Sequence, residues 1–179
     1  MNGEEWEILP VTPADAEDLA AIYRPYVEET AVSFEYSAPD GREFARRIAD
    51  VTARYPYLKA VAGGKTVGYA YAHRYRERAA YDRDVEASIY VDRAYRRGGV
   101  GRALYRALAK ALKRQGIRNL YACVTSPREE NDPYLTRDSH RFHIALGFHT
   151  IGTFPHSGYK FGRWYDTVWY ALDLDEENL

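Results

Sequence analysis

Apolar residues recur along this chain with two different periods, and each period predicts one type of element. Alternation at every second position, or a short apolar run, is typical of strands. We expect strands at Trp6–Leu9, Tyr57–Ala62, Thr66–Arg74, Asp84–Val91, Leu120–Val124, Thr150–Phe154 and Asp166–Leu172. Apolar residues spaced by three or four predict helices that begin near Thr12 and Asp40, and two more at Arg102–Gln115 and Ser139–Leu146.

Residues that favour helix ends and turns stand at the borders of these segments. Thr12 followed by Pro13 is typical of a helix start, and Asp40 with Glu43 three residues later fits a capping box. Gly63–Gly64 lies between two expected strands and therefore predicts a hairpin.

The order of these elements predicts a single domain of the mixed α/β (α+β) class over residues 1–179. A chain of this length is long enough to bury a core without disulfides or metal ions. No repeat or long linker divides it, and its longest polar connection runs from Thr125 to Asp138. The acidic end, residues 173–179, is expected to be a frayed tail.

Composition narrows the class of protein. Hydrophobic residues make up 46% and charged residues 28%, as in ordinary soluble domains, and the net charge is -1. The single cysteine, Cys123, excludes a disulfide framework and is expected to be an inert core thiol. The acidic start lacks a signal-peptide pattern and no apolar run is long enough to span a bilayer, so we expect a cytoplasmic protein with no membrane partner.

The near-zero net charge conceals a basic segment built around a glycine-rich loop. From Arg93 to Arg118 there are nine basic residues and no acidic one. Within it, Arg96-Arg97-Gly98-Gly99-Val100-Gly101 follows an expected strand, and Arg102 opens an expected helix. Glycines let backbone amides approach a ligand, while arginines and a helix N-terminus attract phosphate, so this loop predicts a phosphate site. The alternative is a glycine-rich turn before a solvated basic helix.

The spacing Arg96-x-x-Gly99-x-Gly101 resembles the pyrophosphate loop of the GCN5-related N-acetyltransferases (GNAT). Further stretches, in the same order, resemble the phosphinothricin acetyltransferase-like group of that superfamily over nearly the whole chain. They are Ser33–Glu35, Tyr55–Leu58, Gly68–Ala72, Arg78–Asp82, Val85–Val91, Leu104–Tyr105, Phe142–Phe148 and Gly158–Asp166. The resemblance implies one mostly antiparallel sheet flanked by helices, with a V-shaped split between central strands. It also implies acetyl-CoA as co-substrate and no metal.

The resemblance assigns roles in the expected reaction. Glu86 matches the carboxylate that acts as general base on the attacking amine. The stretch Ile89-Tyr90-Val91 matches the strand whose backbone binds the pantetheine arm and stabilises the oxyanion. His143 matches a helix position from which the departing thiolate is protonated. The alternative for His143 is a residue that only packs or hydrogen-bonds near the sulfur.

Further residues match segments that line the acceptor side in this group. They are Phe34, Glu35, Arg78, Tyr81, Lys160 and Trp164. In a group that accepts small amino-acid-like substrates, Arg78 or Lys160 would bind a carboxylate or phosphinate. The alternative is that Tyr81 and Trp164 are core residues and that Arg78 pairs with Asp82. The chain contains 17 tyrosines, several of them in these matched segments, so an aromatic acceptor pocket is expected.

Some features depart from the group or point elsewhere. Arg83 stands where the group often has tryptophan, and the connection from Thr125 to Asp138 is longer than in its best-known members. Asn131 lies too far upstream to align with the asparagine that meets the pantetheine there. His140 and His143 have helical metal-pair spacing, but no further ligand set accompanies them. Arg83 and the longer connection weaken any transfer of the acceptor's identity.

The expected function is acetyl transfer from acetyl-CoA to the primary amine of a small acceptor of the phosphinothricin or methionine sulfoximine type, by direct attack in a ternary complex. The alternatives are a non-catalytic acyl-CoA-binding module and an acetyltransferase for a protein N-terminus or a polyamine. The basic helix would also suit phosphates of a nucleic acid, but no base-stacking pattern accompanies it, so no such partner is expected. Members of the group commonly form homodimers, so the resemblance implies a homodimer as a possible assembly of this chain.

Overall fold

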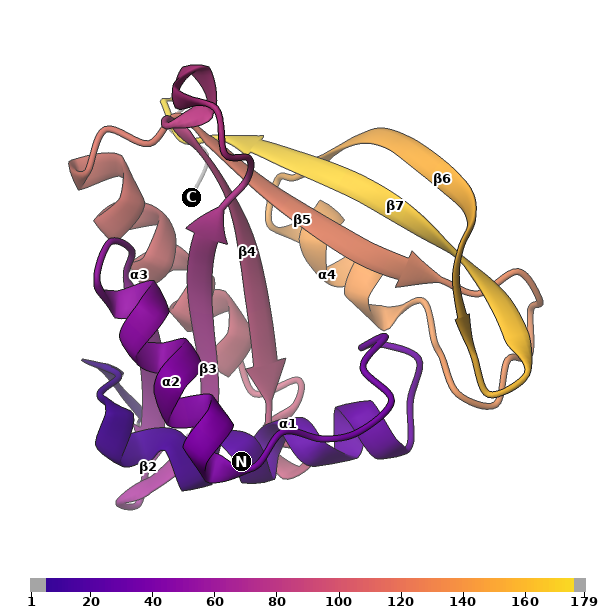
Figure 1. Ribbon diagram of the computed structural model, residues 1–179, viewed down its shortest axis with the longest axis horizontal. Helices are drawn as coiled ribbons and strands as arrows, with labels where there is room; N and C mark the ends of the chain where they lie inside the picture. Colours follow the sequence, from indigo (N-terminus) through magenta and orange to yellow (C-terminus); the bar gives the residue numbers. More distant parts are fainter. Residues whose placement is uncertain (1–5, 176–179) are drawn as a thin grey trace.

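The computed structural model describes residues 6–175, which fold around one seven-stranded sheet (Figure 1). Its strands are β1 (Trp6–Pro10), β2 (Tyr57–Ala62), β3 (Lys65–Arg74), β4 (Asp84–Val91), β5 (Asn119–Ser126), β6 (His149–Lys160) and β7 (Arg163–Asp173). Their order across the sheet is β1-β2-β3-β4-β5-β7-β6. β4 and β5 are parallel, and the other neighbouring pairs are antiparallel. The expected mixed, mostly antiparallel sheet is confirmed.

The helices of the described residues are α1 (Ala16–Glu28), α2 (Gly41–Thr52), α3 (Val100–Arg114) and α4 (Asp138–Ala145). Single 3₁₀ turns precede α1, β4 and α3. The carboxylate of Asp40 accepts a hydrogen bond from the backbone N–H of Glu43 at 2.8 Å, so the predicted cap of α2 is confirmed. Within residues 6–175, none of the helices has the length and apolar character needed to cross a membrane.

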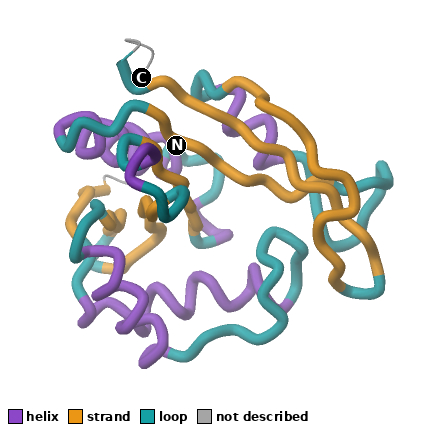
Figure 2. Tube along the Cα trace, turned by 45° about the horizontal axis from the view of Figure 1, so that its top comes forward, coloured by secondary structure: helices purple, strands orange, loops and turns teal. Residues whose placement is uncertain are grey.

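The two faces of β3 carry side chains of different size, and this difference separates the helices. Tyr69 and Tyr71 lie on the face covered by α1 and α2, where they join a core of aromatic and aliphatic residues. Ala70 and Ala72 lie on the opposite face, where their small side chains let α3 pack close to the sheet. Figure 2 shows these helices on opposite sides of the strands.

β4 and β5 separate soon after they begin. Their register comprises Asp84↔Asn119, Val85↔Leu120 and Glu86↔Tyr121, and it ends there. β4 continues to Val91 as a partner of β3, whereas β5 continues as a partner of β7. Figure 1 shows the two strands diverging from their shared end, which confirms the expected V-shaped split.

The last two strands are longer than the sequence pattern predicts. The stretch between the two expected strands forms a tight hairpin, with Tyr159 opposite Trp164 and Lys160 opposite Arg163. Phe161 and Gly162 make the turn, with φ of 52° and 72°. Glycines and a lysine interrupt the apolar alternation in this stretch, so the pattern does not reveal the full length of the strands. Strands of an edge hairpin can pair without alternating in hydrophobicity.

The predicted frayed tail is wrong for its first residues. Asp173 is the last residue of β7, and Leu174 is buried. The backbone N–H of Leu174 donates to the carbonyl of Arg118 at 2.8 Å, so the chain is held to the end of α3 and the start of β5. Residues 176–179 lie outside the described residues.

Candidate active site

Glu86 lies at the apex of the split, because it is the last residue of β4 that pairs with β5. Its side chain, 23% exposed, belongs to the face of β4 opposite the buried Val85 and Ala87. Burial raises the pKa of Glu86 above its usual value, and the neighbouring charge of His73 offsets part of that rise. A carboxylate whose pKa is raised in this way holds a proton more readily than an exposed one, which suits a general base.

Cys123 corrects the expectation of a core thiol, because it is exposed on β5. Val124 and Ala122 are buried, so Cys123 lies on the opposite face of the strand. Desolvation and the nearby charge of Glu86 raise the pKa of its thiol to about 11. The thiol is therefore protonated at neutral pH and is a weak nucleophile.

The glycine-rich loop has the backbone conformation that an anion site needs. Gly99 is the N-cap of α3 in the left-handed region with φ 92°, and Arg97 also has a positive φ of 64°. No side chain caps the helix, so its first N–H groups lack a side-chain acceptor. A Cβ on Gly101 would lie 3.1 Å from the ring of Phe142, so glycine gives close packing where α3 starts against α4. These features fit the pyrophosphate of acetyl-CoA.

Arginines surround this helix start. Arg96, Arg97 and Arg102 are exposed, together with Gly98, and among the described residues none of these arginines forms an ion pair. The guanidinium of Arg96 lies 5.1 Å from the centre of the Tyr26 ring. Val100, by contrast, is buried and anchors the first turn of α3 in the core. The loop therefore presents free positive charge and backbone N–H groups at one place.

The backbone of β4 beyond Glu86 is only partly available to a ligand. Ile89, Tyr90 and Val91 have no register partner on β5. However, the Tyr26 hydroxyl donates to the carbonyl of Val91 at 2.6 Å and accepts from its N–H at 3.3 Å. Val91 is thus already bonded within the protein. This arrangement does not agree with the expectation that the backbone of Val91 binds pantetheine. The residues of β4 between Glu86 and Val91 keep an edge without a strand partner on β5.

The surroundings of His143 differ from those expected of a general acid. It is 3% exposed, and its Nδ1 lies 2.8 Å from the carbonyl of Ser139 while its Nε2 lies 3.0 Å from the Tyr105 hydroxyl. A carbonyl only accepts, so Nδ1 carries the proton and Tyr105 donates to Nε2. Desolvation lowers the pKa of His143 to about 4. A neutral imidazole whose one N–H is bonded to a carbonyl is poorly placed to protonate a thiolate, which favours the alternative of a packing residue.

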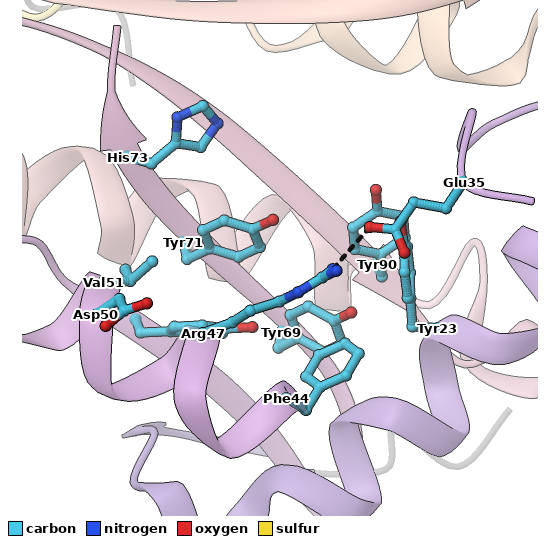
Figure 3. Close-up of a pocket in the computed structure, with 11 residues that line it drawn as sticks. Tyr23, Glu35, Phe44, Arg47, Asp50, Val51, Tyr69, Tyr71, His73 and Tyr90 are labelled. Atoms are coloured by element: carbon cyan, nitrogen blue, oxygen red, sulfur yellow. Dashed lines mark hydrogen bonds and ion pairs between the residues drawn. The ribbon is translucent and has the colours of Figure 1, made fainter. Parts of the chain in front are cut away.

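A cavity of about 260 Å³ lies on the sheet face covered by α1 and α2 (Figure 3). It is lined by Tyr23, Glu35, Phe44, Arg47, Asp50, Val51, Tyr57, Tyr69, Tyr71, His73 and Tyr90. The guanidinium of Arg47 crosses the cavity and donates to Glu35 at 2.7 Å. Arg47 also donates to Glu43 at 2.9 Å. The walls are therefore aromatic, with one guanidinium held between two carboxylates.

The structure brings only one of the predicted acceptor residues, Glu35, to this cavity. The ring of Phe34 packs against the backbone of Gly158 instead. Tyr81 makes an edge contact with Tyr75 in the loop after β3. Trp164 is 53% exposed on β7, so the core alternative for it is also wrong.

Arg78 is exposed in the loop after β3. The partners of Asp82 are Arg74 at 2.7 Å and Arg54 at 3.1 Å, so the alternative in which Arg78 pairs with Asp82 is wrong. Among residues 6–175, Arg78 therefore has no ion-pair partner.

The surroundings of Lys160 disagree most clearly with the prediction, in which Lys160 would bind a carboxylate or phosphinate of the acceptor. Lys160 is only 4% exposed. Its ammonium donates to the carbonyls of Val27, Thr30 and Ser33 at 2.6, 2.9 and 2.6 Å. Three bonds use all the protons of the ammonium, so it cannot also bind an acceptor carboxylate. Lys160 instead holds the segment between α1 and α2 against the end of β6, and that segment carries Glu35.

Sequence reasoning missed three ionisable residues of the cavity besides its tyrosines, namely Arg47, Asp50 and His73. Arg47 belongs to the charged face of α2, whose pattern is that of an ordinary solvated helix. His73 belongs to β3, on the same face as Tyr69 and Tyr71. The period of two along β3 is a usable signal, because it places this histidine on the same face as Tyr69 and Tyr71 of the matched stretch Gly68–Ala72.

Potential metal ligands do not gather in the part of the chain that the structure describes, where no group of three or more His, Cys, Asp or Glu side chains could hold an ion. His140 and His143 have other partners. His140 contacts the Tyr170 hydroxyl at 2.8 Å and the carbonyl of Thr125 at 3.2 Å. Both nitrogens of each histidine are therefore used inside the fold.

Comparison with known proteins places these features in a family. The profile of the acetyltransferase (GNAT) domain matches residues 8–169. A phosphinothricin N-acetyltransferase of Streptomyces viridochromogenes is 35% identical over 169 residues, which are 94% of this chain and 88% of that protein. An L-methionine sulfoximine/L-methionine sulfone acetyltransferase of Pseudomonas paraeruginosa is 34% identical, with 90% and 91% of the two chains covered.

A solved structure agrees with these relatives. The crystal structure of a phosphinothricin acetyltransferase from Sinorhizobium meliloti in complex with acetyl-CoA superposes with a TM-score of 0.84 at 32% identity, covering 94% of this chain and 88% of that one. Fold, glycine-rich loop and sequence relatives agree, and the chain belongs to the GNAT superfamily of N-acetyltransferases, within its phosphinothricin acetyltransferase-like group.

Proposed function

We propose that this enzyme transfers the acetyl group of acetyl-CoA to the primary amine of a small amino-acid-like acceptor, of the phosphinothricin or methionine sulfoximine type. The observation that carries the proposal is the position of Glu86 at the apex of the split, where β4 leaves β5. The relatives named for acetylation of phosphinothricin and of methionine sulfoximine support the acceptor class.

The loop at the start of α3 would hold the cofactor. The uncapped N–H groups after Gly99 would bind the pyrophosphate, and Arg96, Arg97 and Arg102 would offset its charge. The open edge of β4 before Val91 would face the pantetheine arm. When bound, acetyl-CoA supplies the thioester that is to be attacked.

Glu86 accepts the proton that the acceptor's ammonium must lose, directly or through one water, and so exposes the nitrogen lone pair. A backbone N–H of β4 beyond Glu86 stabilises the negative charge on the carbonyl oxygen. Solvent water protonates the leaving thiolate, because a free thiol has a pKa of about 8.5 and needs little help. Cys123 stays protonated, which favours direct attack by the amine over an acyl-enzyme.

A single acceptor screen tests the function. Purified protein is mixed with acetyl-CoA and each of phosphinothricin, methionine sulfoximine, other amino acids, a polyamine and a peptide N-terminus, and thiol release is recorded. We expect the fastest release with a small amino-acid-like amine. Binding of acetyl-CoA without thiol release in any mixture would instead identify a non-catalytic binding module.

The glycine-rich loop predicts a specific effect of Gly99→Ala. We expect the KM for acetyl-CoA to rise about tenfold with little change in kcat, because a φ of 92° strains an alanine by about 1–3 kcal/mol and the loop shifts. Steady-state kinetics with varied acetyl-CoA measure this. Gly116→Ala is the matched control, since Gly116 has φ 78° at the other end of the same helix. Equal KM values in both variants would contradict the loop assignment.

The aromatic cavity predicts a different effect of Arg47→Met. We expect the KM for the acceptor to rise about fivefold, because the variant loses charged hydrogen bonds worth about 1 kcal/mol and frees Glu35 from its position. The KM for acetyl-CoA should stay near that of the wild type. Arg46→Met serves as control, because Arg46 is the neighbouring arginine and its side chain is 62% exposed. An unchanged acceptor KM in Arg47→Met would remove this cavity from the acceptor site.

A further inference from the structure

His73 lies next to Glu86 on the adjacent strand. The two residues are register partners between β3 and β4, and His73 Nε2 lies 4.0 Å from a carboxylate oxygen of Glu86. His73 also lines the aromatic cavity, beyond Tyr71 in the view of Figure 3. Its side chain is 39% exposed, compared with 23% for Glu86, so the imidazole is more accessible to solvent than the carboxylate.

The hydrogen bond at the other nitrogen orients the ring. His73 Nδ1 lies 3.2 Å from the carbonyl of Arg74, and a carbonyl only accepts, so Nδ1 carries the proton in the neutral imidazole. Nε2 is then the free acceptor, and it is the nitrogen nearer to Glu86. The 4.0 Å separation is about 1 Å longer than direct proton transfer requires, and such contacts tighten when substrates bind.

Glu86 needs an exit for its proton, if it is the general base of the proposed function. Each turnover leaves a proton on its carboxyl, and that proton must leave before the next amine can be deprotonated. Other groups near Glu86 are poor acceptors. The Cys123 thiol already holds its proton at neutral pH, and desolvation keeps the pKa of the Tyr71 hydroxyl raised.

The charged groups that face the same cavity have other partners. From α2, Arg47 bonds to Glu35 and Glu43. Asp50, also on α2, pairs with Arg46 at 2.7 Å. Among the Arg, Asp, Glu and His side chains that line the cavity, His73 is therefore the one with a free acceptor atom toward Glu86.

We propose that His73 is a proton-relay residue that resets Glu86. The O–H bond of the protonated carboxyl breaks as an N–H bond forms at His73 Nε2, which leaves a carboxylate beside an imidazolium. The imidazolium then releases its proton to water or buffer at the exposed side of the cavity. The inference rests on the proposed function, because Glu86 acquires its proton only if it acts as base.

The test compares His73→Gln with the wild type in weakly buffered solution, using an acceptor that the wild type acetylates. We expect kcat to fall roughly tenfold with a smaller change in the KM for acetyl-CoA, and we expect added imidazole to restore much of the lost rate. Wild-type kcat should not respond to imidazole. His149→Gln is the matched control, because His149 is exposed on β6. It should behave as the wild type.

The outcomes of these measurements distinguish a proton relay at His73 from a purely structural role. An unchanged kcat in folded His73→Gln would overturn the relay. A loss of kcat that imidazole does not restore would also overturn it, and would indicate that His73 only shapes the site. His73→Ala is measured in the same way, so that a folding defect of one variant leaves the other to decide. A wild-type protein that releases no thiol with any acceptor would instead contradict the proposed function itself.

Discussion

Replacing Glu86 with glutamine is expected to lower kcat about 10²- to 10⁴-fold, with the KM for acetyl-CoA near the wild-type value. Glutamine has nearly the shape of the carboxyl but cannot accept the ammonium proton at neutral pH. The remaining rate should come from the small fraction of acceptor that is already an amine. Steady-state kinetics with a verified acceptor measure the effect.

The pH dependence adds a second readout of the same residue. The base must be ionised, so wild-type kcat/KM should fall as the pH drops through the pKa of Glu86, which burial places above its usual range. In Glu86→Gln this acid limb should disappear, because the substitution removes the carboxyl whose titration causes it. The residual rate should then rise with pH only through deprotonation of the acceptor.

Stability separates a catalytic from a structural role of Glu86. A raised pKa means that the folded state binds this proton more tightly than the unfolded chain, so ionised Glu86 opposes folding as the pH rises through that range. We therefore expect the Tm of Glu86→Gln to equal or exceed that of the wild type. Glu28→Gln, an exposed change on α1, should alter neither rate nor Tm. A fully active Glu86→Gln would refute the base assignment.

Replacing Lys160 with methionine should have the largest effect on stability. The substitution leaves the carbonyls of Val27, Thr30 and Ser33 without the ammonium that now donates to them. Unsatisfied buried groups of this kind cost about 3 kcal/mol or more together, equivalent to a fall in Tm of roughly 6–12 °C for a chain of this size. Chemical and thermal denaturation of the purified variant measure the loss.

The control for Lys160 is an exposed lysine of the same sheet. The side chain of Lys65 is 67% exposed, so Lys65→Met should change the free energy of unfolding by less than about 0.5 kcal/mol. If Lys160→Met kept the wild-type stability and only raised the acceptor KM, Lys160 would bind the acceptor after all. The two roles therefore predict opposite patterns of stability and KM.

Local signals account for the parts of the fold that the sequence predicted. The alternation in β4 places Glu86 opposite Val85 and Ala87, and the structure keeps that alternation to the end of the strand. The glycines of the loop are an equally local signal, because glycine adopts a positive φ without steric cost, as Gly99 does. The split between β4 and β5 came from the family resemblance and was confirmed.

The sequence by itself determined most of the elements, the glycine-rich loop before α3 and the face of β4 on which Glu86 lies, because periodicity and backbone preference act over a few neighbouring residues. Only the tertiary structure decided what the isolated polar residues do. Lys160 meets Val27 across 133 positions, and His143 meets Tyr105 across 38. A lysine or histidine has the same local pattern whether it faces a substrate or a buried carbonyl, and its partner depends on how distant segments pack. The same packing brought Arg47 and His73 to one cavity.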